Sequence, residues 1–351
     1  MSVSIGGTTG ITFNDASVQN TSAFTGGFAF RNRIINGAMV IDQRNAGASV
    51  TPTNAQYLVD RWSANLSQAS KYSVQQNAGS VTPPAGFINY LGVTSLSAYS
   101  IVSTDTFGVR QRVEGLNMTD FGWGSASAVT VTLSFWARSS LTGTFGGALQ
   151  NSAANRSYPF SYTISSANTW EQKTVTIAGD TSGTWLTTNG IGVEVYFGLG
   201  VGSTYSGTAG AWAGANYSSA TGATSVVGTN GATFYITGVQ LEKGSTATSF
   251  DYRPYGTELA LCQRYYSVAT TTTRFGSYSG IQYLRTTIST PASMRASPTV
   301  TKLTNGTLSN TVAGNITYTS LSPTQFGFEV ASSATGDCYA IGGTASLESE
   351  L

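Results

Sequence analysis

The sequence predicts an all-β protein with a jelly-roll β-sandwich, a small C-terminal β domain and an extended N-terminal segment. Short stretches in which apolar and polar residues alternate recur along most of the 351 residues, which is the pattern of strands with one buried face. Clusters of Gly, Asn, Ser and Thr separate these stretches, and the 41 glycines favour turns. Helical periodicity is confined to residues 256–266. The predicted domains are residues 1–30, 31–252 and 253–351.

The predicted sandwich consists of strands that each carry one apolar face. The clearest strand covers residues 128–139, where Val131, Leu133 and Phe135 alternate with polar residues. The same alternation predicts strands over residues 107–113, 170–177, 191–199 and 233–242. Because no helical segment separates these strands, we expect them to form two packed sheets.

The chain after a turn at residues 253–256 is predicted to form a connector and then the small β domain. The connector contains the helical candidate, and Arg253, Glu258 and Arg264 are expected to form one ion-pair network there. Short strands are then predicted over residues 281–289, 299–303, 325–331 and 337–341.

The first 30 residues have few large apolar side chains between Gly, Ser, Thr and Asn. So short and sparse a segment cannot bury a core of its own. We expect it to become ordered only against a neighbouring copy or another protein. The residues predicted to mediate this attachment or oligomerisation are Ile11, Phe13, Val18 and Phe24.

The composition argues against several classes of function. The chain has no histidine, so Ser-His-Asp and Cys-His catalysis are excluded, and we predict no catalytic residues. Its 17 basic and 16 acidic residues give a net charge of +1, which does not favour binding to nucleic acid or to an anionic membrane surface. No apolar run is long enough to span a bilayer, so membrane insertion is not expected. We also predict no cofactor and no metal site.

The two cysteines, Cys262 and Cys338, match no metal-binding spacing. The N-terminus has neither the basic start nor the apolar block of a signal peptide. Synthesis in a reducing cytoplasm is therefore expected, with both thiols free and partly buried. A disulfide between them is the alternative.

Aromatic residues on outward strand positions are the candidate binding residues, because sugar rings stack their C–H faces on flat aromatic side chains. The predicted glycan-binding residues are Trp136, Tyr196, Trp212, Tyr217, Arg138 and Glu194. Trp212 and Tyr217 belong to a long Gly-rich loop over residues 198–231. Alternatively, these aromatic residues cover the edge of the sandwich or a contact between subunits. Trp62 and Trp170 are expected to anchor the core.

Glycoside hydrolysis requires only a pair of carboxylates. Glu114, Glu171 and Glu194 all lie on predicted strands, so such a pair is conceivable. With 16 acidic residues in the whole chain, the simpler interpretation is that these carboxylates are solvated or paired with arginines.

Several motifs of the predicted sandwich occur in a recognisable order. They are RIINGAMVIDQR, DRWS at residues 60–63, VTLSFWARS, TWEQKTVTI and FYITGVQLE. Together they resemble the jelly-roll carbohydrate-binding modules of families 4 and 9, over residues 30–252. These modules usually carry Asp where this chain has Thr237 and Gly238. A calcium site, which needs several oxygen ligands, is therefore not expected here.

A narrower resemblance rests on three further blocks: ITFNDASVQ, ITGVQLEKGSTATSFDYRPYGTELALCQRYY at residues 236–266 and MRASPTV at residues 294–300. They are similar to the tail-fibre or virion structural proteins of tailed bacteriophages. The resemblance implies a virion component that is assembled in the bacterial cytoplasm as a homo-oligomer, most often a trimer. It would attach to other phage proteins by its N-terminus and present its β domains to glycans of the bacterial surface. The alternatives are a capsid decoration or head-fibre protein without a receptor role, and a glycan-cleaving enzyme.

Overall fold

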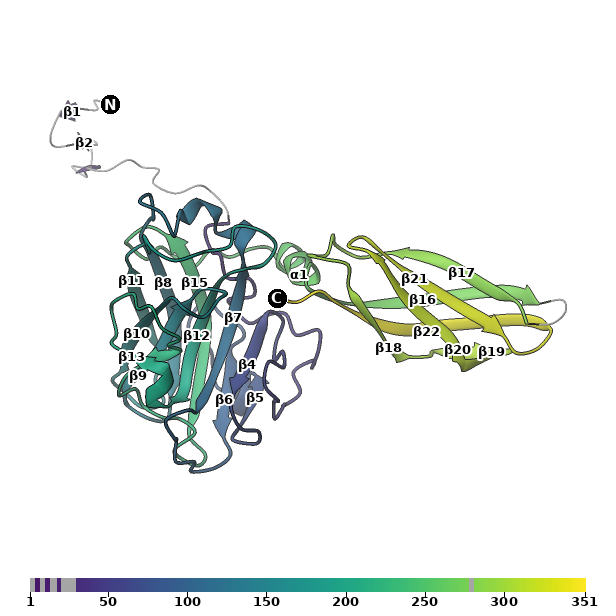
Figure 1. Cartoon of the computed structure of the whole chain (residues 1–351), viewed down its shortest axis with the longest axis horizontal. Coiled ribbons are helices and arrows are strands. Elements are labelled where there is room, and N and C mark those ends of the chain that lie inside the picture. The colour runs from purple at the N-terminus through teal and green to yellow at the C-terminus, as the bar shows by residue number, and fades with distance from the viewer. Residues whose placement is uncertain (1–3, 7–9, 13–17, 20–29, 278–280) are drawn as a thin grey trace.

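The computed structural model describes residues 4–6, 10–12, 18–19, 30–277 and 281–351, and Figure 1 shows their arrangement. A broad two-sheet unit and a narrower, elongated β unit lie side by side, with the helix α1 (Tyr255–Gln263) between them. The all-β prediction is confirmed. Among the described residues, no helix combines the length and the hydropathy needed to cross a bilayer.

The larger unit is a jelly-roll β-sandwich of two five-stranded antiparallel sheets. The first, called here the β12 sheet, has the order β10 (Ser157–Ile164), β9 (Gly143–Gln150), β12 (Ile191–Val201), β7 (Thr106–Glu114) and β4 (Trp62–Leu66). The second, the β15 sheet, has the order β11 (Glu171–Ile177), β8 (Val131–Ser139), β15 (Thr233–Lys243), β6 (Leu91–Ser95) and β5 (Tyr72–Gln76).

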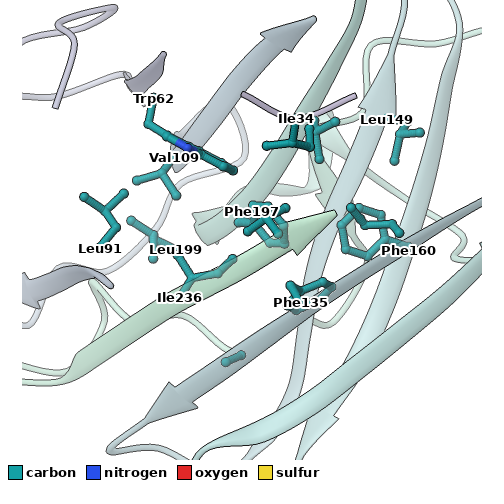
Figure 2. Close-up of a cluster of buried hydrophobic side chains, with 14 of the residues drawn as sticks. Ile34, Trp62, Leu91, Val109, Phe135, Leu149, Phe160, Phe197, Leu199 and Ile236 are labelled. Carbon is teal, nitrogen blue, oxygen red and sulfur yellow. The ribbon is translucent and has the colours of Figure 1, made fainter. Parts of the chain in front are cut away.

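The inward positions of the two sheets form one large core, and Figure 2 shows its centre. The rings of Phe135 and Phe197 pack edge to face, with 4.9 Å between their centroids. Trp62 is fully buried beside Phe197. The prediction for Trp62 is confirmed. The prediction for Trp170 is wrong, because Trp170 packs on the outer face of the β15 sheet, against Tyr90 and Tyr235.

Short elements complete this unit. They are the 3₁₀ turns η1 (Ala78–Ser80), η2 (Gly115–Asn117), η3 (Thr119–Phe121) and η4 (Ser203–Tyr205), and the paired strands β13 (Ser206–Gly207) and β14 (Ser219–Ala220).

The elongated unit also packs two antiparallel sheets on each other. One has the order β16 (Tyr266–Ser277), β22 (Gly336–Glu348) and β18 (Thr299–Thr304), with β19 (Thr307–Ser309) also pairing with β22. The other has the order β17 (Tyr283–Ser289), β21 (Gln325–Ser332) and β20 (Thr311–Ser322). Phe326, Phe328 and Leu347 are buried between the sheets. The sequence analysis missed β16 and β20, whose many Thr and Ser residues dilute the apolar alternation.

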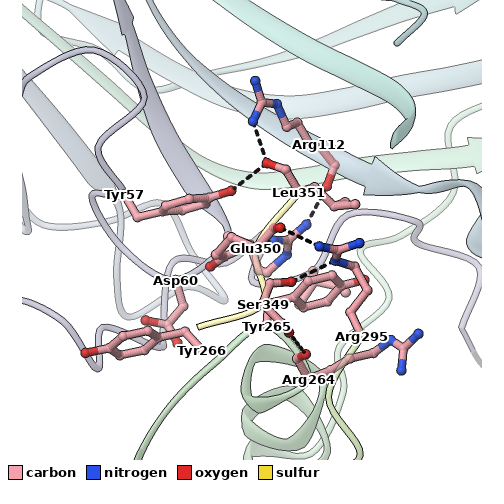
Figure 3. Close-up of polar contacts among 12 residues, drawn as sticks. Tyr57, Asp60, Arg112, Arg264, Tyr265, Tyr266, Arg295, Ser349, Glu350 and Leu351 are labelled. Atoms are coloured by element: carbon pink, nitrogen blue, oxygen red, sulfur yellow. Dashed lines mark hydrogen bonds and ion pairs between the residues drawn. The ribbon is translucent and has the colours of Figure 1, made fainter. Parts of the chain in front are cut away.

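Arginine contacts hold residues 349–351 against the sandwich and against the loop before β18 (Figure 3). Arg61 is buried, forms an ion pair with Glu350 and stacks on the ring of Tyr265, with 3.5 Å from its guanidinium carbon to the ring centroid. Arg112 of β7 donates to the backbone oxygen of Leu351, and Arg295 Nε donates to that of Ser349 at 2.7 Å.

The prediction of one ion-pair network in the connector is wrong for Arg264. Arg253 does pair with Glu258, at 3.2 Å. Arg264 instead pairs with Glu114 on β7, at 2.7 Å, and the Tyr265 hydroxyl donates to the same carboxylate at 2.6 Å. The Arg264–Glu114 pair therefore links the connector to the β12 sheet rather than stabilising the connector itself.

Three short strands are described in the N-terminal segment: β1 (Ser4–Gly6), β2 (Gly10–Thr12) and β3 (Val18–Gln19), which pair in that order. Ile11 lies in β2 and Val18 in β3, whereas Phe13 and Phe24 lie outside the described residues. The attachment role of these four residues stays a prediction. Cys262 and Cys338 are both buried and free, as expected.

Candidate binding site

A groove of about 410 Å³ crosses the outer face of the β12 sheet. Strands β4, β7, β9 and β12 supply its floor, and loops on either side supply its walls. Hydroxyl, amide and charged side chains dominate the lining: Asn54, Asn65, Ser67, Thr104, Thr106, Arg110, Gln150, Glu194, Tyr196, Tyr205, Asn216 and Ser218.

The groove floor is a fixed triad of polar side chains, Arg110, Glu194 and Tyr196. Strand pairing sets it, because Tyr196 lies opposite Arg110 and Glu194 opposite Arg112. One guanidinium nitrogen of Arg110 donates to Glu194 Oε2 at 3.1 Å and to the Tyr196 hydroxyl at 2.7 Å. The Tyr196 hydroxyl in turn donates to Glu194 Oε2 at 2.8 Å. Each of the three residues is more than nine-tenths buried.

Burial keeps the phenol of Tyr196 in the groove floor protonated. Desolvation, followed by the charge of Glu194, raises the pKa of Tyr196 above its usual range, so the phenol stays neutral and able to donate. Arg110 neutralises Glu194, and Arg112 Nε lies 3.5 Å from the same oxygen. The floor is therefore a hydrogen-bonding surface rather than a site with a free carboxylate.

One part of the groove wall comes from the long loop between β12 and β15. Tyr205, Asn216 and Ser218 belong to this loop. The Gln150 amide of β9 donates to Asn216 Oδ1 at 2.5 Å and so ties the loop to the sheet. A ligand in the groove meets both donors and acceptors within a few ångströms, which suits a molecule rich in hydroxyl groups.

The structure divides the six residues predicted to bind glycan among separate places. Glu194 and Tyr196 lie together in the groove. Trp136 and Arg138 lie on β8, on the outer face of the opposite sheet, where the Arg138 guanidinium lies over the ring of Tyr235. The six residues therefore do not lie together, and their role in glycan binding stays a prediction.

The two loop aromatics have packing roles. Trp212 contacts Trp123, Trp185 and Tyr158 edge-on, and its indole nitrogen donates to the Ala178 oxygen at 2.7 Å. Tyr217 packs against Gly207, where any side chain would overlap its ring. The position of Trp212 agrees with the alternative interpretation, in which these aromatic residues cover the edge of the sandwich.

Sequence reasoning missed Arg110, Gln150, Tyr205 and Asn216 as groove residues. A signal existed for Arg110, which belongs to the predicted strand over residues 107–113 and alternates there with apolar residues. No sequence pattern indicates that the loop carrying Tyr205 and Asn216 folds back over Gln150.

The three carboxylates considered for hydrolysis are each engaged with a cation. Glu114 pairs with Arg264, and Glu194 with Arg110. Glu171 accepts from Lys173 at 2.5 Å and from the backbone of Ser165 and Ser166, and the hydrogen bond from Lys173 lowers its pKa. All three carboxylates are thus paired with a cation, in agreement with the simpler interpretation of the sequence.

The positions where a calcium ligand was considered have other roles. The Thr237 hydroxyl donates to the Asn89 oxygen at 2.7 Å, and Gly238 forms a bulge in β15. Within the described ranges, no group of three or more acidic or cysteine side chains is placed to hold a metal ion.

Comparison with known proteins gives no family. No protein-family model matches the chain, and no curated protein sequence matches it. Among solved structures, the chain is similar to the enzymatically active domain of tailspike protein 4 of bacteriophage CBA120, with 12% identity and a TM-score of 0.34 over 61% of this chain and 22% of that chain.

Two carbohydrate-binding modules are also similar in shape. One is a family 11 module from Clostridium thermocellum, in complex with a mixed-linked tetrasaccharide, with 11% identity and a TM-score of 0.29 over 57% of this chain and 98% of that chain. The other is the N-terminal cellulose-binding domain of a Cellulomonas fimi β-1,4-glucanase, with 16% identity and a TM-score of 0.27 over 50% of this chain and 90% of that chain. No residue role is transferred from these structures.

Proposed function

We propose that this chain is a non-catalytic, glycan-binding appendage of a tailed-bacteriophage particle, and that it holds a glycan in the groove of the β12 sheet. The observation that supports this most is the buried triad of Arg110, Glu194 and Tyr196 under a wall of amides and hydroxyls. Sugar hydroxyl groups both donate and accept hydrogen bonds, and the groove offers both. Because the polar groups of the groove already hydrogen-bond to one another, few side chains lose conformational freedom when a glycan binds.

The groove favours a neutral glycan. Its floor contains one arginine and one glutamate that neutralise each other, and the other lining side chains are uncharged. Few aromatic faces are available for stacking, since Tyr196 is almost fully buried. Recognition would therefore rest mainly on hydrogen bonds, with a modest affinity per site.

The appendage role rests on the sequence resemblance of residues 236–266 and 294–300 to phage tail-fibre and virion proteins. In this proposal residues 1–30 attach the chain to the particle, and the chain is a homotrimer located in the virion. Several weak glycan sites on one oligomer then give a strong overall attachment to a bacterial surface.

The groove is tested by native affinity electrophoresis in gels that contain neutral glucans or purified bacterial O-antigen polysaccharides. We expect at least one polysaccharide to retard the chain. The double variant Tyr205→Ala/Asn216→Ala should lose retardation while it stays folded, with a Tm lowered only by the loss of the Gln150–Asn216 hydrogen bond. Thr174→Ala on the exposed face of β11 is the matched control and should behave as the parent chain. No retardation in any gel, or equal retardation of the groove variant, would contradict glycan binding in this groove.

The appendage role is tested with a chain that lacks residues 1–30. Light scattering should show a trimer for the full chain and a monomer for the shortened one, and only the full chain should enter phage particles. A shortened chain that still enters particles would overturn the attachment role. If the purified full chain does not bind host cells, a decoration protein without a receptor role becomes the better description. Sugar release from the polysaccharide would instead indicate the glycan-cleaving alternative.

A further inference from the structure

A second hollow, of about 200 Å³, lies on the other side of the sandwich, away from the groove. Three segments that are distant in sequence meet there: residues 32–40, residues 86–88 and residues 250–258. Its apolar lining includes Val40, Phe87, Ile88, Phe250 and Tyr252. This hollow shares no lining residue with the β12 groove.

A glycine in β15 makes room for the hollow's central ring. Gly238 has a φ of +61° at a break in strand register, a backbone conformation that favours glycine. A Cβ atom there would lie 2.5 Å from the ring of Phe87 and 3.1 Å from that of Trp136. Phe87 can therefore lie on the sheet beside Trp136 only because this position has no side chain.

Three rings form a rigid aromatic platform: Phe87, Phe250 and Tyr252. The Phe87–Phe250 and Phe250–Tyr252 pairs are edge-to-face, with centroids 5.1 and 4.8 Å apart, and Phe87 and Tyr252 are 5.5 Å apart. The Tyr252 hydroxyl donates to the Gly86 oxygen, which fixes the ring although the residue is 55% exposed. A fixed and exposed aromatic face can bind an apolar surface without paying for lost rotamer freedom.

The carboxylate of Asp251 lies beside this platform. Asp251 Oδ2 accepts from the Asn32 backbone at 3.2 Å, while its Oδ1 accepts no hydrogen bond from the described part of the chain. Arg253 and Glu258 neutralise each other in the wall, so Asp251 leaves the hollow with one net negative charge. This charge disfavours anionic ligands, and the open oxygen can accept hydrogen bonds from hydroxyl groups.

We propose that this aromatic platform is a second sugar site, which takes a single ring of a neutral glycan. The ring would stack its C–H face on Tyr252 and donate hydroxyls to Asp251. The small volume accommodates one ring rather than an extended chain, so we infer that the site binds a terminal residue. Because the two sites lie on opposite sheets, one chain could bind two glycan strands at once.

The competing occupant is a second copy of this chain, since Ile88 at the rim is 76% exposed. A stable protein interface needs on the order of 1,000 Å² of buried surface. The hollow is small, and its open carboxylate would be left buried and unpaired by an apolar partner. Both features favour a sugar ring.

The site is tested by saturation-transfer NMR with methyl α-glucoside, methyl α-galactoside and methyl α-mannoside as probes. The protein is the full chain carrying the groove substitutions Tyr205→Ala/Asn216→Ala, so the result does not depend on the groove. We expect transfer to at least one probe, with the affinity lowered about tenfold or more by Tyr252→Ala, as expected for the loss of a stacking ring. Asp251→Asn, which keeps an acceptor for the Asn32 backbone, should weaken binding less.

Leu96→Ala is the matched control, because it removes an exposed apolar side chain that lines neither the hollow nor the groove. It should leave both the affinity and the solution mass unchanged. The proposal is overturned if no probe shows transfer, if Tyr252→Ala leaves transfer intact, or if Tyr252→Ala and Ile88→Ala both lower the mass of the oligomer. The last result would assign the hollow to contact between copies.

Discussion

The two outer faces of the sandwich follow the same strand alternation but differ in chemistry. On the β12 sheet, the outward residues Arg110, Glu194 and Tyr196 are buried and bonded to one another. On the β15 sheet, outward Trp136 and Tyr235 lie among aromatic rings contributed by loops. An outward position on a strand is therefore not the same as an exposed one. The loops that fold over each sheet decide which chemistry the face presents.

The largest expected effect comes from breaking the groove floor. Glu194→Ala leaves Arg110 more than nine-tenths buried without its carboxylate, so we expect a loss of about 3 kcal/mol in the free energy of unfolding. Urea denaturation measures this loss. The control is Glu329→Ala, which removes the partner of the largely exposed Arg285 and should cost less than about 1 kcal/mol. Equal losses in the two variants would show that the triad is not a buried charge pair.

Asp60 contrasts with the paired Glu194, because Asp60 is buried and forms no ion pair among the described residues, so it should make the stability depend on pH. Asp60 is almost fully buried and accepts hydrogen bonds from Gln43, and desolvation raises its pKa to about 6. Between about pH 4 and pH 6 the folded chain therefore binds more protons at this group than the unfolded chain. Asp60 should lower the stability as the pH rises through this window, by up to about 3 kcal/mol.

Thermal denaturation from pH 4 to pH 7 measures the effect of Asp60. Asp60→Asn removes the titrating group and should flatten the profile between pH 4 and pH 6. If the profiles of the parent chain and the variant are parallel, Asp60 does not titrate in this window.

On the aromatic face, the strongest single constraint is the space above Gly238. Gly238→Ala places a methyl group against Phe87 in a left-handed backbone conformation, and we expect a loss of about 2 kcal/mol. Gly222→Ala is the matched control, since Gly222 has a φ of +77° and a Cβ atom there would meet no atom of the described residues within 4 Å, apart from its chain neighbours. The control isolates the backbone strain. If both variants lose the same stability, Phe87 moves aside and the platform is not rigid.

The smallest expected effect comes from a substitution that removes the hydroxyl of Tyr252 but keeps its ring. Tyr252→Phe removes the hydrogen bond to the Gly86 oxygen on a half-exposed side chain and should cost about 0.5 kcal/mol. Because the ring remains, binding of the methyl glycosides should persist, in contrast to Tyr252→Ala. Chemical denaturation and the same NMR assay measure the two effects. Loss of binding in Tyr252→Phe would show that the hydroxyl, and not the ring face, contacts the sugar.

Local patterns in the sequence determined the fold class and five of the ten sandwich strands, which are β7, β8, β11, β12 and β15. Alternation in residues 128–139 identified β8 and its buried residues, because a strand with one apolar face can only bury that face against another layer. Short-range composition also indicated the helix α1, which begins one residue before the expected start. The Thr-rich strands β16 and β20 were missed, because strand pairing rather than apolar alternation defines them.

The two candidate sites were decided by the tertiary structure. Tyr196 was predicted to face outward, but only the pairing of β7 with β12 brings Arg110 into hydrogen-bond distance of its hydroxyl. Trp136 was also predicted to bind glycan, and it lies on the opposite sheet, beside Phe87, which follows from no periodicity in the chain. The physical reason is that alternation specifies the face of a strand, whereas a site requires partners from strands and loops far apart in sequence, and those are selected by long-range packing.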